Sequence, residues 1–288
     1  MKLSQVLYTQ GFGSRRECEG LIVSGFVSVG QVVCDDPFEE FDPEGLQFTV
    51  RGESWPFREK ALIVLNKPAG HECSQKPKHH PSVYSLLPAP LRRRDVQAVG
   101  RLDEDTTGLL LMTDDGGLIH RWTSPKHHVP KVYEIGCKHP VTAEQVRQLL
   151  AGVTLIDDPV PVRAAEAEAT GAFAGPQAPG LGELHGLRMT LTEGKYHQVK
   201  RMVAAVGNRV EALHRSRYGA LALPADLAPG QWRWLAGPSD VAPVDGAASR
   251  ARPKATLIKP RNSSNRGPVI ASSAICAPMS MEFEATGQ

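Results

Sequence analysis

Apolar and polar positions alternate with two different periods along the chain and divide it into short helices and strands. Residues 3–7 carry apolar side chains at helical spacing, and a GFGS turn follows. Ser14 is suited to cap a second helix, with Glu17 three residues later to complete a capping box. Residues 26–33 alternate around a glycine, as in a short hairpin. The pattern predicts a small N-terminal module of two helices followed by strands.

A second region opens with the apolar segment 61–68, and strand-like and helix-like patterns are interspersed in it. Strand-like runs occur at 109–113, 132–136, 186–191 and 232–235, and helical patterns at 142–152 and 197–207. Because the two kinds of element do not alternate regularly, the pattern favours a mixed α+β sheet over a doubly wound one.

Changes of composition mark the predicted domains. Residues 1–50 form the first module, and residues 51–60 form a linker, because two prolines, two glycines and many charges lie between residues 42 and 60. The main domain is predicted over 61–240, with a surface loop rich in Gly, Pro and Ala at 171–182. Residues 246–288 are rich in Ser, Pro, Ala and Arg without periodicity, so we expect a disordered basic tail.

The composition excludes several classes of protein. The 288 residues contain no run of eighteen apolar residues, which argues against a membrane-spanning helix. The N-terminus lacks the apolar core of a signal peptide. The five cysteines are scattered and never form a CxxC pair, which argues against a disulfide framework and a thiolate zinc site. We therefore expect a cytoplasmic protein without a membrane partner.

The overall charge does not indicate a nucleic-acid-binding protein. Lys and Arg number 33 against 31 Asp and Glu, and the first 60 residues hold ten acidic and six basic side chains. Any polyanion site must therefore come from local clusters. Basic clusters occur at 76–80, 92–94, 126–128 and 215–217. Each one alone is equally compatible with a solvated loop, but four around one domain favour contacts to phosphates.

The densest candidate chemistry lies in residues 100–125, where Asp103 follows a Gly-Arg-Leu turn and precedes an apolar strand. A carboxylate in such a loop is suited to act as a nucleophile or a general base. The same pattern is compatible with an Asp that caps a turn. Further aspartates nearby leave a divalent-metal site open, but Asp114 and Asp115 precede two glycines and are more typical of a turn between a strand and a helix.

Two further segments carry candidate side chains. Residues 193–208 have the pattern of an amphipathic helix with Lys200 and Arg201 in its first turns. The alternative to a functional role is that these two basic side chains are simply exposed to solvent. In the strand at 130–135, Lys131 and Tyr133 share a face because side chains alternate. Such a tyrosine either packs in the core or offers a surface on which a base stacks.

Several of these segments together resemble one enzyme family. The segment GRLDEDTTGLLLMTDDG resembles the catalytic motif of pseudouridine synthases of the small-subunit rRNA branch. The segments NKPAGHECS, TSPKHHVPKVYEI and EGKYHQVKRMVAAVGN are similar to further blocks of that family, in the same order. Residues 1–48 resemble an S4 RNA-binding domain, with SRRECEGLIVSGFVSVGQVV as its core. The resemblance spans residues 1–235 and implies a mixed, mainly antiparallel catalytic sheet.

The resemblance also implies a reaction and the residues that perform it. The N1–C1′ bond of a uridine in RNA is broken, the uracil rotates, and it is rejoined through C5, without a cofactor or a metal. By motif match, Asp103 attacks or deprotonates the ribose, Tyr133 packs on the uracil, and Lys200 pairs with Asp103. A carboxylate in this role must be ionised, and a nearby cation favours that form. The candidate RNA-binding residues are Arg15, Arg16, Arg101, Lys126, His127, His128, Lys131, His197, Gln198, Arg201 and Arg215.

Four functions are compatible with these patterns. The first is isomerisation of a uridine in 16S rRNA, free or in a partly assembled ribonucleoprotein, by a protein that is plausibly a monomer. The second is the same chemistry on 23S rRNA. The third is a non-catalytic assembly factor that binds RNA through the S4-like module, but such a factor has no need of Asp103, Tyr133 and Lys200. The fourth, a metal-dependent hydrolase, is the least favoured.

Overall fold

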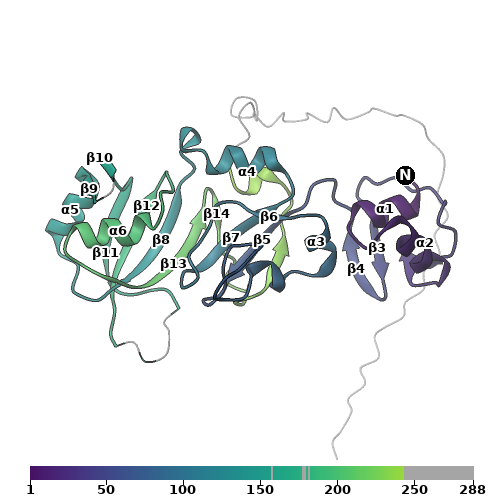
Figure 1. Ribbon diagram of the computed structural model, residues 1–288, viewed down its shortest axis with the longest axis horizontal. Helices are drawn as coiled ribbons and strands as arrows, with labels where there is room; N and C mark the ends of the chain where they lie inside the picture. The colour runs from purple at the N-terminus through teal and green to yellow at the C-terminus, as the bar shows by residue number, and fades with distance from the viewer. Residues whose placement is uncertain (157, 177–179, 181, 243–288) are drawn as a thin grey trace, which may run out of the picture. The chain divides into compact units, whose positions relative to one another are not determined.

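The computed structural model describes residues 1–156, 158–176, 180 and 182–242 (Figure 1). The described residues belong to one compact unit. The predicted tail at 246–288 and part of the loop at 171–182 lie outside them. Within the described ranges, no helix is both long enough and apolar enough to cross a membrane.

The N-terminal module pairs two helices with a small antiparallel sheet, as the sequence pattern predicts. The second helix has the predicted capping box: Ser14 Oγ accepts a hydrogen bond from the Glu17 N–H, and the Glu17 carboxylate accepts one from the Ser14 N–H. The sheet has the strand order β2-β1-β3-β4. The elements are α1 (Leu3–Thr9), α2 (Arg15–Val23), β1 (Val27–Val29), β2 (Val32–Cys34), β3 (Gln47–Val50) and β4 (Glu53–Pro56).

The predicted linker at 51–60 is wrong over half of its length. Strand β4 lies inside it and pairs with β3, and its Trp55 is only 6% exposed. The indole packs edge-on against Phe12 and Trp234, with ring centroids 5.4 Å away in each case. The glycine at position 52 therefore belongs to a turn between two strands of the module, and the connection to the main domain begins only after β4.

The main sheet of the described residues has the order β11-β12-β8-β13-β7-β5-β15, with β14 on β13 and β6 on β7 (Figure 1). Only the β13–β7 pair is parallel, which confirms the mixed, mainly antiparallel α+β fold. The strands are β5 (Leu62–Lys67), β6 (Gln97–Ala98), β7 (Thr107–Thr113), β8 (Lys131–Cys137), β11 (Glu166–Ala172), β12 (His185–Leu191), β13 (Val210–Tyr218), β14 (Leu221–Ala222) and β15 (Trp232–Trp234).

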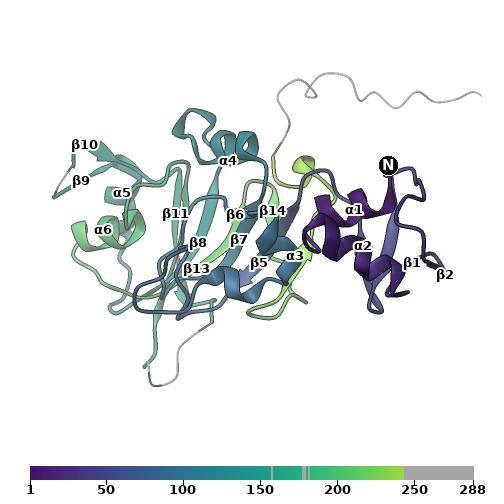
Figure 2. The same cartoon turned by 45° about the vertical axis from the view of Figure 1, so that its right-hand side comes forward.

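Helices and short hairpins cover this sheet. Both views place α5, α6 and the β9–β10 pair together at the β11–β12 end of the sheet (Figures 1 and 2). Helix α4 begins where the aspartate pair was predicted to form a turn, with Asp115 as its N-cap. The elements are α3 (Ala89–Arg93), α4 (Gly116–Thr123), α5 (Ala143–Ala151), α6 (Gln198–Ala205), β9 (Val153–Leu155), β10 (Asp158–Val162) and the 3-10 turns η1 (Val83–Leu86), η2 (Pro125–His127) and η3 (Pro238–Asp240).

The central strands are buried on both faces of the sheet. In β5, Ile63 and Leu65 belong to one apolar cluster, and Leu62 and Val64 belong to the cluster on the opposite side. Strand β7 divides its leucines in the same way. Strands buried on both faces need continuous apolar runs rather than alternation. This explains why the segments 61–68 and 109–113 stand out in the sequence.

The basic cluster at 92–94 joins the N-terminal module to the main sheet. The Arg94 guanidinium forms an ion pair with Asp114, with 2.7 Å between Nη2 and Oδ2, and it donates to Gln10 Oε1 at 2.7 Å. It also donates to the backbone carbonyls of Arg58 and Glu59. The side chain of Arg94 is only 4% exposed. For this residue, the predicted contact with phosphates is therefore wrong, because its charge and its donors are used inside the protein.

Candidate active site

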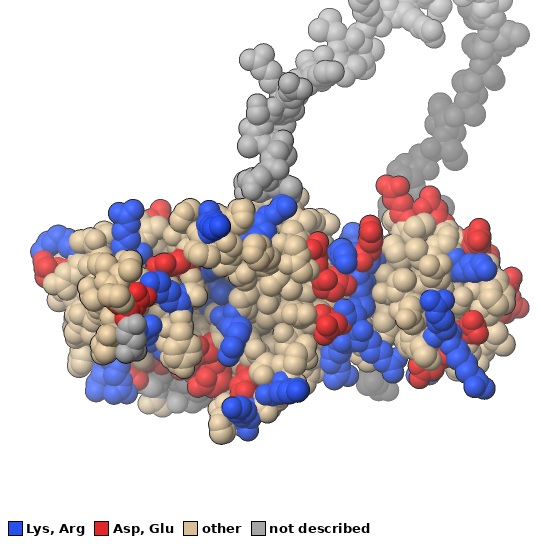
Figure 3. Space-filling model, turned by 45° about the horizontal axis from the view of Figure 1, so that its top comes forward, with Lys and Arg blue, Asp and Glu red and all other residues tan. Residues whose placement is uncertain are grey.

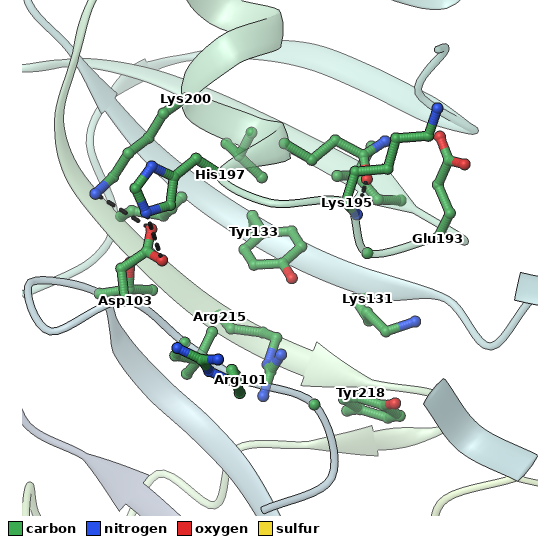
Figure 4. A pocket seen from close by; sticks show the side chains of 18 of the residues that line it. Arg101, Asp103, Lys131, Tyr133, Glu193, Lys195, His197, Lys200, Arg215 and Tyr218 are labelled. Carbon is green, nitrogen blue, oxygen red and sulfur yellow. Dashed lines mark hydrogen bonds and ion pairs between the residues drawn. The ribbon is translucent and has the colours of Figure 1, made fainter. Parts of the chain in front are cut away.

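A cavity of about 130 Å³ opens where the loop before β7 meets the segment that leads into α6. Its wall comes from the loop at 100–106, from strands β8 and β13, and from residues 193–200. Figure 4 shows the side chains that line it. The cavity therefore brings together three segments that the sequence singled out as separate candidates.

Asp103 lies at one end of this cavity between two basic side chains (Figure 4). Its Oδ1 is 3.1 Å from Nε2 of His197, and its Oδ2 is 3.3 Å from Nζ of Lys200. The Asp103 side chain is 25% exposed, so it is held in place but open to a ligand. The His197 ring contacts the carboxylate, and its predicted contact with RNA stays a prediction.

Lys200 contacts a second carboxylate more closely than the first. Its ammonium lies 2.7 and 2.8 Å from the two carboxylate oxygens of Asp105. Burial lowers the pKa of Lys200, but the hydrogen bond to Asp105 and the charge of Asp103 outweigh it, so the pKa lies above its usual value. The ammonium is therefore a bridge between two aspartates. No feature of the sequence distinguishes Asp105 from the other acidic residues nearby.

His197 has an unusual backbone conformation for its position. It is the N-cap of α6 with φ 47° and ψ 33°, in the left-handed region that few residues other than glycine adopt. Its ring stacks on the ring of Tyr196, with centroids 3.8 Å apart and 20° between the planes. The backbone strain is tolerated where it directs the imidazole at Asp103, as is common at functional sites.

Tyr133 and Lys131 line the same cavity, as their alternation along the strand predicted. The Tyr133 ring is 8% exposed and lies in the middle of the cavity (Figure 4). Lys131 is 7% exposed and donates to the carbonyl of Val129 at 2.8 Å. Burial, together with the charge of Arg215, lowers the pKa of Lys131 to about 8. The predicted contact of Lys131 with RNA stays a prediction, and its burial places the side chain at the cavity rather than on the open surface.

Arg215 is likewise buried rather than part of a basic loop. It lies on β13 opposite Gly108 of β7 and is 2% exposed. A side chain on Gly108 would place its Cβ 2.4 Å from the Arg215 carbonyl oxygen, so the close approach of the two strands requires this glycine. The alternative of a solvated loop at 215–217 is therefore wrong for Arg215, which lines the cavity.

Lys67 fixes the loop that carries Asp103. It is fully buried at the end of β5 and donates to the carbonyls of Pro68, Glu104 and Thr106 at 3.0, 3.1 and 2.8 Å. Burial lowers its pKa to about 8. A lysine is rarely fully buried, and here three backbone acceptors satisfy all three of its donors. Lys67 is not among the predicted site residues. The signal that could have found it is a single lysine at the end of an apolar strand.

The buried charge of Lys131 predicts an unusual pH dependence of stability. Its pKa is 10.5 as a free side chain and about 8 in the fold, so burying the charged form costs about 3 kcal/mol below pH 8. This cost is lost as the pH rises from 8 to 10.5, where the unfolded chain binds the extra proton. We expect Lys131→Met to gain stability relative to the wild type at pH 7, and the gain to shrink by about 2–3 kcal/mol at pH 10. Urea unfolding of both proteins at the two pH values measures this, and a gain independent of pH contradicts it.

The remaining predicted RNA-binding residues lie in three places. Arg101 is exposed at the rim of the cavity. Gln198 is 4% exposed, and its amide bonds with Glu193 and the Lys195 N–H, so its donors and acceptor are engaged inside the protein. Arg201 donates to the Tyr196 carbonyl at 3.3 Å. Arg201 does not line the cavity, and neither do Arg15 and Arg16 at the start of α2 or Lys126, His127 and His128 near η2.

A wider groove of about 860 Å³ lies next to Asp103 and carries the basic loop at 76–80. The Glu72 carboxylate shapes this loop by accepting hydrogen bonds from the backbone N–H groups of Lys78, His79 and His80 at 2.8–3.1 Å. These bonds lower the pKa of Glu72 to about 2. Figure 3 shows blue and red side chains interspersed on the drawn face, so the basic groups are local features rather than one continuous surface.

The described residues contain no group of three or more His, Cys, Asp or Glu side chains arranged to hold a metal ion. The Asp103 carboxylate contacts an imidazole and an ammonium, and the ammonium competes with a metal for it. The expectation that neither metal nor cofactor takes part stays a prediction.

Comparison with known proteins adds independent evidence. Residues 1–44 match the S4 domain family, and residues 61–205 match the RNA pseudouridylate synthase family. An uncharacterized RNA pseudouridine synthase of Bacillus subtilis is 37% identical over 235 residues, which cover 82% of this chain and 95% of the relative. The ribosomal small subunit pseudouridine synthase A of Escherichia coli is 44% identical over 173 residues, covering 60% of this chain and 69% of the relative.

A solved structure supports the same assignment. A crystal structure of a pseudouridylate synthase is 30% identical, covers 82% of this chain and 96% of its own, and superimposes with a TM-score of 0.53. The fold, the order of the motifs and the family match over half of the chain agree. The chain therefore belongs to the RNA pseudouridylate synthase family, a family of isomerases that act on RNA, and carries an S4 RNA-binding domain at its N-terminus.

Proposed function

We propose that this protein converts one uridine of small-subunit (16S) rRNA to pseudouridine and that Asp103 is the residue that acts on the ribose. The observation that supports this most directly is the Asp103 carboxylate, held by His197 and Lys200 at the end of a cavity lined by Tyr133. The cavity of about 130 Å³ is smaller than the 300–1,000 Å³ typical of sites for drug-sized ligands and suits a single base. Relatives named ribosomal small subunit pseudouridine synthase A supply the choice of 16S rRNA.

The chemistry follows from the order of groups in the cavity. The target nucleotide leaves its stack, which costs a few kcal/mol, and its base enters beside Tyr133. Stacking on the tyrosine ring returns about 1–3 kcal/mol. Asp103 then lies next to the ribose and either bonds to C1′ or takes the proton from C2′ while the N1–C1′ bond breaks. Lys200 and His197 hold the carboxylate in its reacting position.

Affinity for the RNA backbone comes from outside the cavity. The groove beside Asp103 carries Lys76, Lys78, Arg101 and Lys195, and the S4 domain adds Arg15 and Arg16 at the start of α2. Contacts of this kind release counterions from the RNA, so binding weakens steeply with salt. The S4 domain itself is net acidic, and its contribution depends on these local groups rather than on its overall charge.

Mapping of pseudouridines in rRNA tests the proposal. Both rRNAs from cells that lack the protein are treated with carbodiimide and read by primer extension, beside wild-type cells and cells complemented with Asp103→Asn. We expect one small-subunit site to disappear and to return only with the wild-type protein. If a large-subunit site is lost instead, the proposed reaction is supported but the substrate is 23S rRNA and not 16S rRNA. An unchanged pattern in both rRNAs contradicts the proposed function and favours a non-catalytic role for the S4 domain in ribosome assembly.

A further inference from the structure

Two cations at the inner end of the cavity have no acidic partner among the described residues. Arg215 donates from Nε to the Leu109 carbonyl at 2.8 Å, but its Nη2 is buried without any hydrogen-bond partner in the described part of the chain. Lys131 donates to the Val129 carbonyl. Neither side chain forms an ion pair with any described carboxylate. A buried charge without a counter-charge is costly, so these groups need a reason to be there.

The ring of Tyr218 holds the two cations in place. The Arg215 Cζ lies 5.2 Å from the ring centroid, and the Lys131 Nζ lies 5.0 Å from it. The Tyr218 hydroxyl donates to the Trp122 carbonyl at 2.7 Å, which fixes the ring. The pair is therefore preorganised before any ligand arrives, and the free Nη2 donor is available to it.

The position of this pair relative to Asp103 indicates the ligand. Figure 4 shows Asp103 with Lys200 on one side of Tyr133 and Lys131 on the other, with Arg215 and Tyr218 near the lower edge of the view. Asp103 acts on the ribose, so the sugar lies at its end and the base extends past Tyr133 toward the cations. A phosphate belongs with the sugar, at the open end. The groups that reach the inner cations are therefore the carbonyl oxygens of the base.

The reaction creates negative charge on those oxygens. When the N1–C1′ bond breaks, its electron pair leaves with N1, and the uracil becomes an anion whose charge is shared by O2 and O4. C1′ of the ribose is left one electron pair short. Asp103 supplies that pair by bonding to C1′, or it removes the C2′ proton so that the C2′–H electron pair moves to C1′. When C5 later bonds to C1′, the bond between Asp103 and C1′ breaks or, in the other route, Asp103 returns the proton to C2′. The C5 proton is then released and N1 gains one, so the product has the same atoms as the substrate and Asp103 is regenerated.

Resting on the proposed function, we propose that Arg215 and Lys131 bind the carbonyl oxygens of the detached uracil and stabilise its negative charge while it turns. The site works as an oxyanion hole does, with fixed donors in a dry cavity directed at charge that appears only during the reaction. The cations also keep the free base in the cavity between its two bonding events. Burial lowers the pKa of Lys131 only to about 8, so the side chain is largely protonated at neutral pH and its charge is already in place when that anion forms beside it.

The proposal is tested by comparing two bases that differ in how well they carry negative charge. Fluorine at C5 makes the detached uracil a more stable anion, so cleavage of 5-fluorouridine depends less on the protein's cations. Single-turnover loss of the target nucleoside is measured by nuclease digestion and chromatography, for RNA carrying uridine or 5-fluorouridine at the site that the wild type converts. The variants are Arg215→Met and, as a matched exposed arginine on β15, Arg233→Met.

We expect Arg215→Met to slow the reaction of uridine about 10²-fold, as for loss of one oxyanion donor, and that of 5-fluorouridine about tenfold less. The RNA affinity of Arg215→Met, measured by filter binding, is expected to match that of the wild type. Arg233→Met is expected to convert uridine and 5-fluorouridine at the wild-type rates. Equal losses on the two bases overturn the proposal, because a residue that only shapes the cavity affects both alike. A wild type that converts no rRNA uridine overturns the proposed function first, and this proposal with it.

Arg215 is buried, so its substitution also tests the fold. If Arg215→Met fails to fold, as judged by its thermal unfolding, Lys131→Met and Arg215→Lys are compared on the same two RNAs. Lys131→Met removes the second cation and is expected to show the same larger loss on uridine than on 5-fluorouridine. Arg215→Lys keeps the charge and is expected to retain part of the lost rate. The absence of any difference between the two bases in these variants overturns the proposal equally.

Discussion

Asp103→Asn is expected to abolish the conversion of uridine to pseudouridine while the protein still binds RNA. Asparagine has the same shape as aspartate but neither attacks C1′ nor takes a proton from the ribose. Loss of a reacting group of this kind costs at least about 10⁴-fold in rate. The two contacts that position the group, at 3.1 Å from His197 and 3.3 Å from Lys200, involve carboxylate oxygens that act as acceptors. Single-turnover kinetics with excess enzyme measure the loss, and filter binding is expected to give an RNA Kd within about threefold of the wild type.

Asp105→Asn is the matched control for that substitution. It makes the same chemical change two residues away, on a side chain that is 58% exposed and also contacts Lys200. We expect a loss of less than about tenfold, because Asp105 acts on the substrate only through the orientation of Lys200. If Asp103→Asn keeps more than a tenth of the wild-type rate, Asp103 is not the group that reacts. If the two variants lose rate equally, the charge of the loop matters rather than the position of one carboxylate.

Much of this fold follows from local patterns in the sequence. The continuous apolar runs at 61–65 and 109–112 become the central strands because both of their faces are buried. The Ser14 capping box forms as the spacing to Glu17 predicts. In both cases the signal and the physical cause lie within a few residues of each other, so an individual sequence contains all the information needed.

Elements with little burial escaped prediction for the opposite reason. Strand β11 reads EAEATGA and is largely exposed at the edge of the sheet, and β10 contains two prolines. Such strands carry no apolar stripe, and their pairing partners decide their conformation. The sequence likewise predicts a linker where β4 forms, because two glycines and many charges flank the one buried Trp55 in the sequence.

In the site, the family resemblance indicated that Lys200 pairs with Asp103, and the structure has that pair at 3.3 Å, but the sequence did not show which other side chains meet. Lys200 and Asp105 lie 95 positions apart, and only the fold brings them to 2.7 Å. The burial of Arg215 could not be read from an Arg-Ser-Arg run, which is typical of a solvated strand or loop. The tight packing of β13 against Gly108 hides this arginine inside the cavity. Pairwise geometry of this kind depends on tertiary contacts, which a local pattern does not contain.

Lys200→Met is expected to lower the rate of isomerisation about 10²–10³-fold with little change in RNA affinity. The ammonium lies 3.3 Å from Asp103 and 2.7 Å from Asp105, so its removal leaves two neighbouring carboxylates without the cation that bridges them. Their repulsion moves Asp103 away from the ribose, and a displacement of about 1 Å in a reacting group costs about 10²-fold. The His197 contact keeps part of the geometry, which is why the loss is smaller than for Asp103→Asn.

The double variant Lys200→Met with Asp105→Asn separates the two parts of this effect. Removing the second carboxylate relieves the repulsion, so the double variant is expected to recover about tenfold of the rate that Lys200→Met loses. Deletion of residues 246–288 serves as the comparison for a basic segment remote in sequence, and it is expected to cost less than Lys200→Met at the same salt concentration. If the double variant is as slow as Lys200→Met, the lysine acts through its own contact with Asp103. If the double variant is slower than Lys200→Met, Asp105 holds the loop directly. Recovery therefore identifies charge balance between the two aspartates as what Lys200 supplies, because the ammonium and its contacts are absent from both variants and only the charge of Asp105 differs between them.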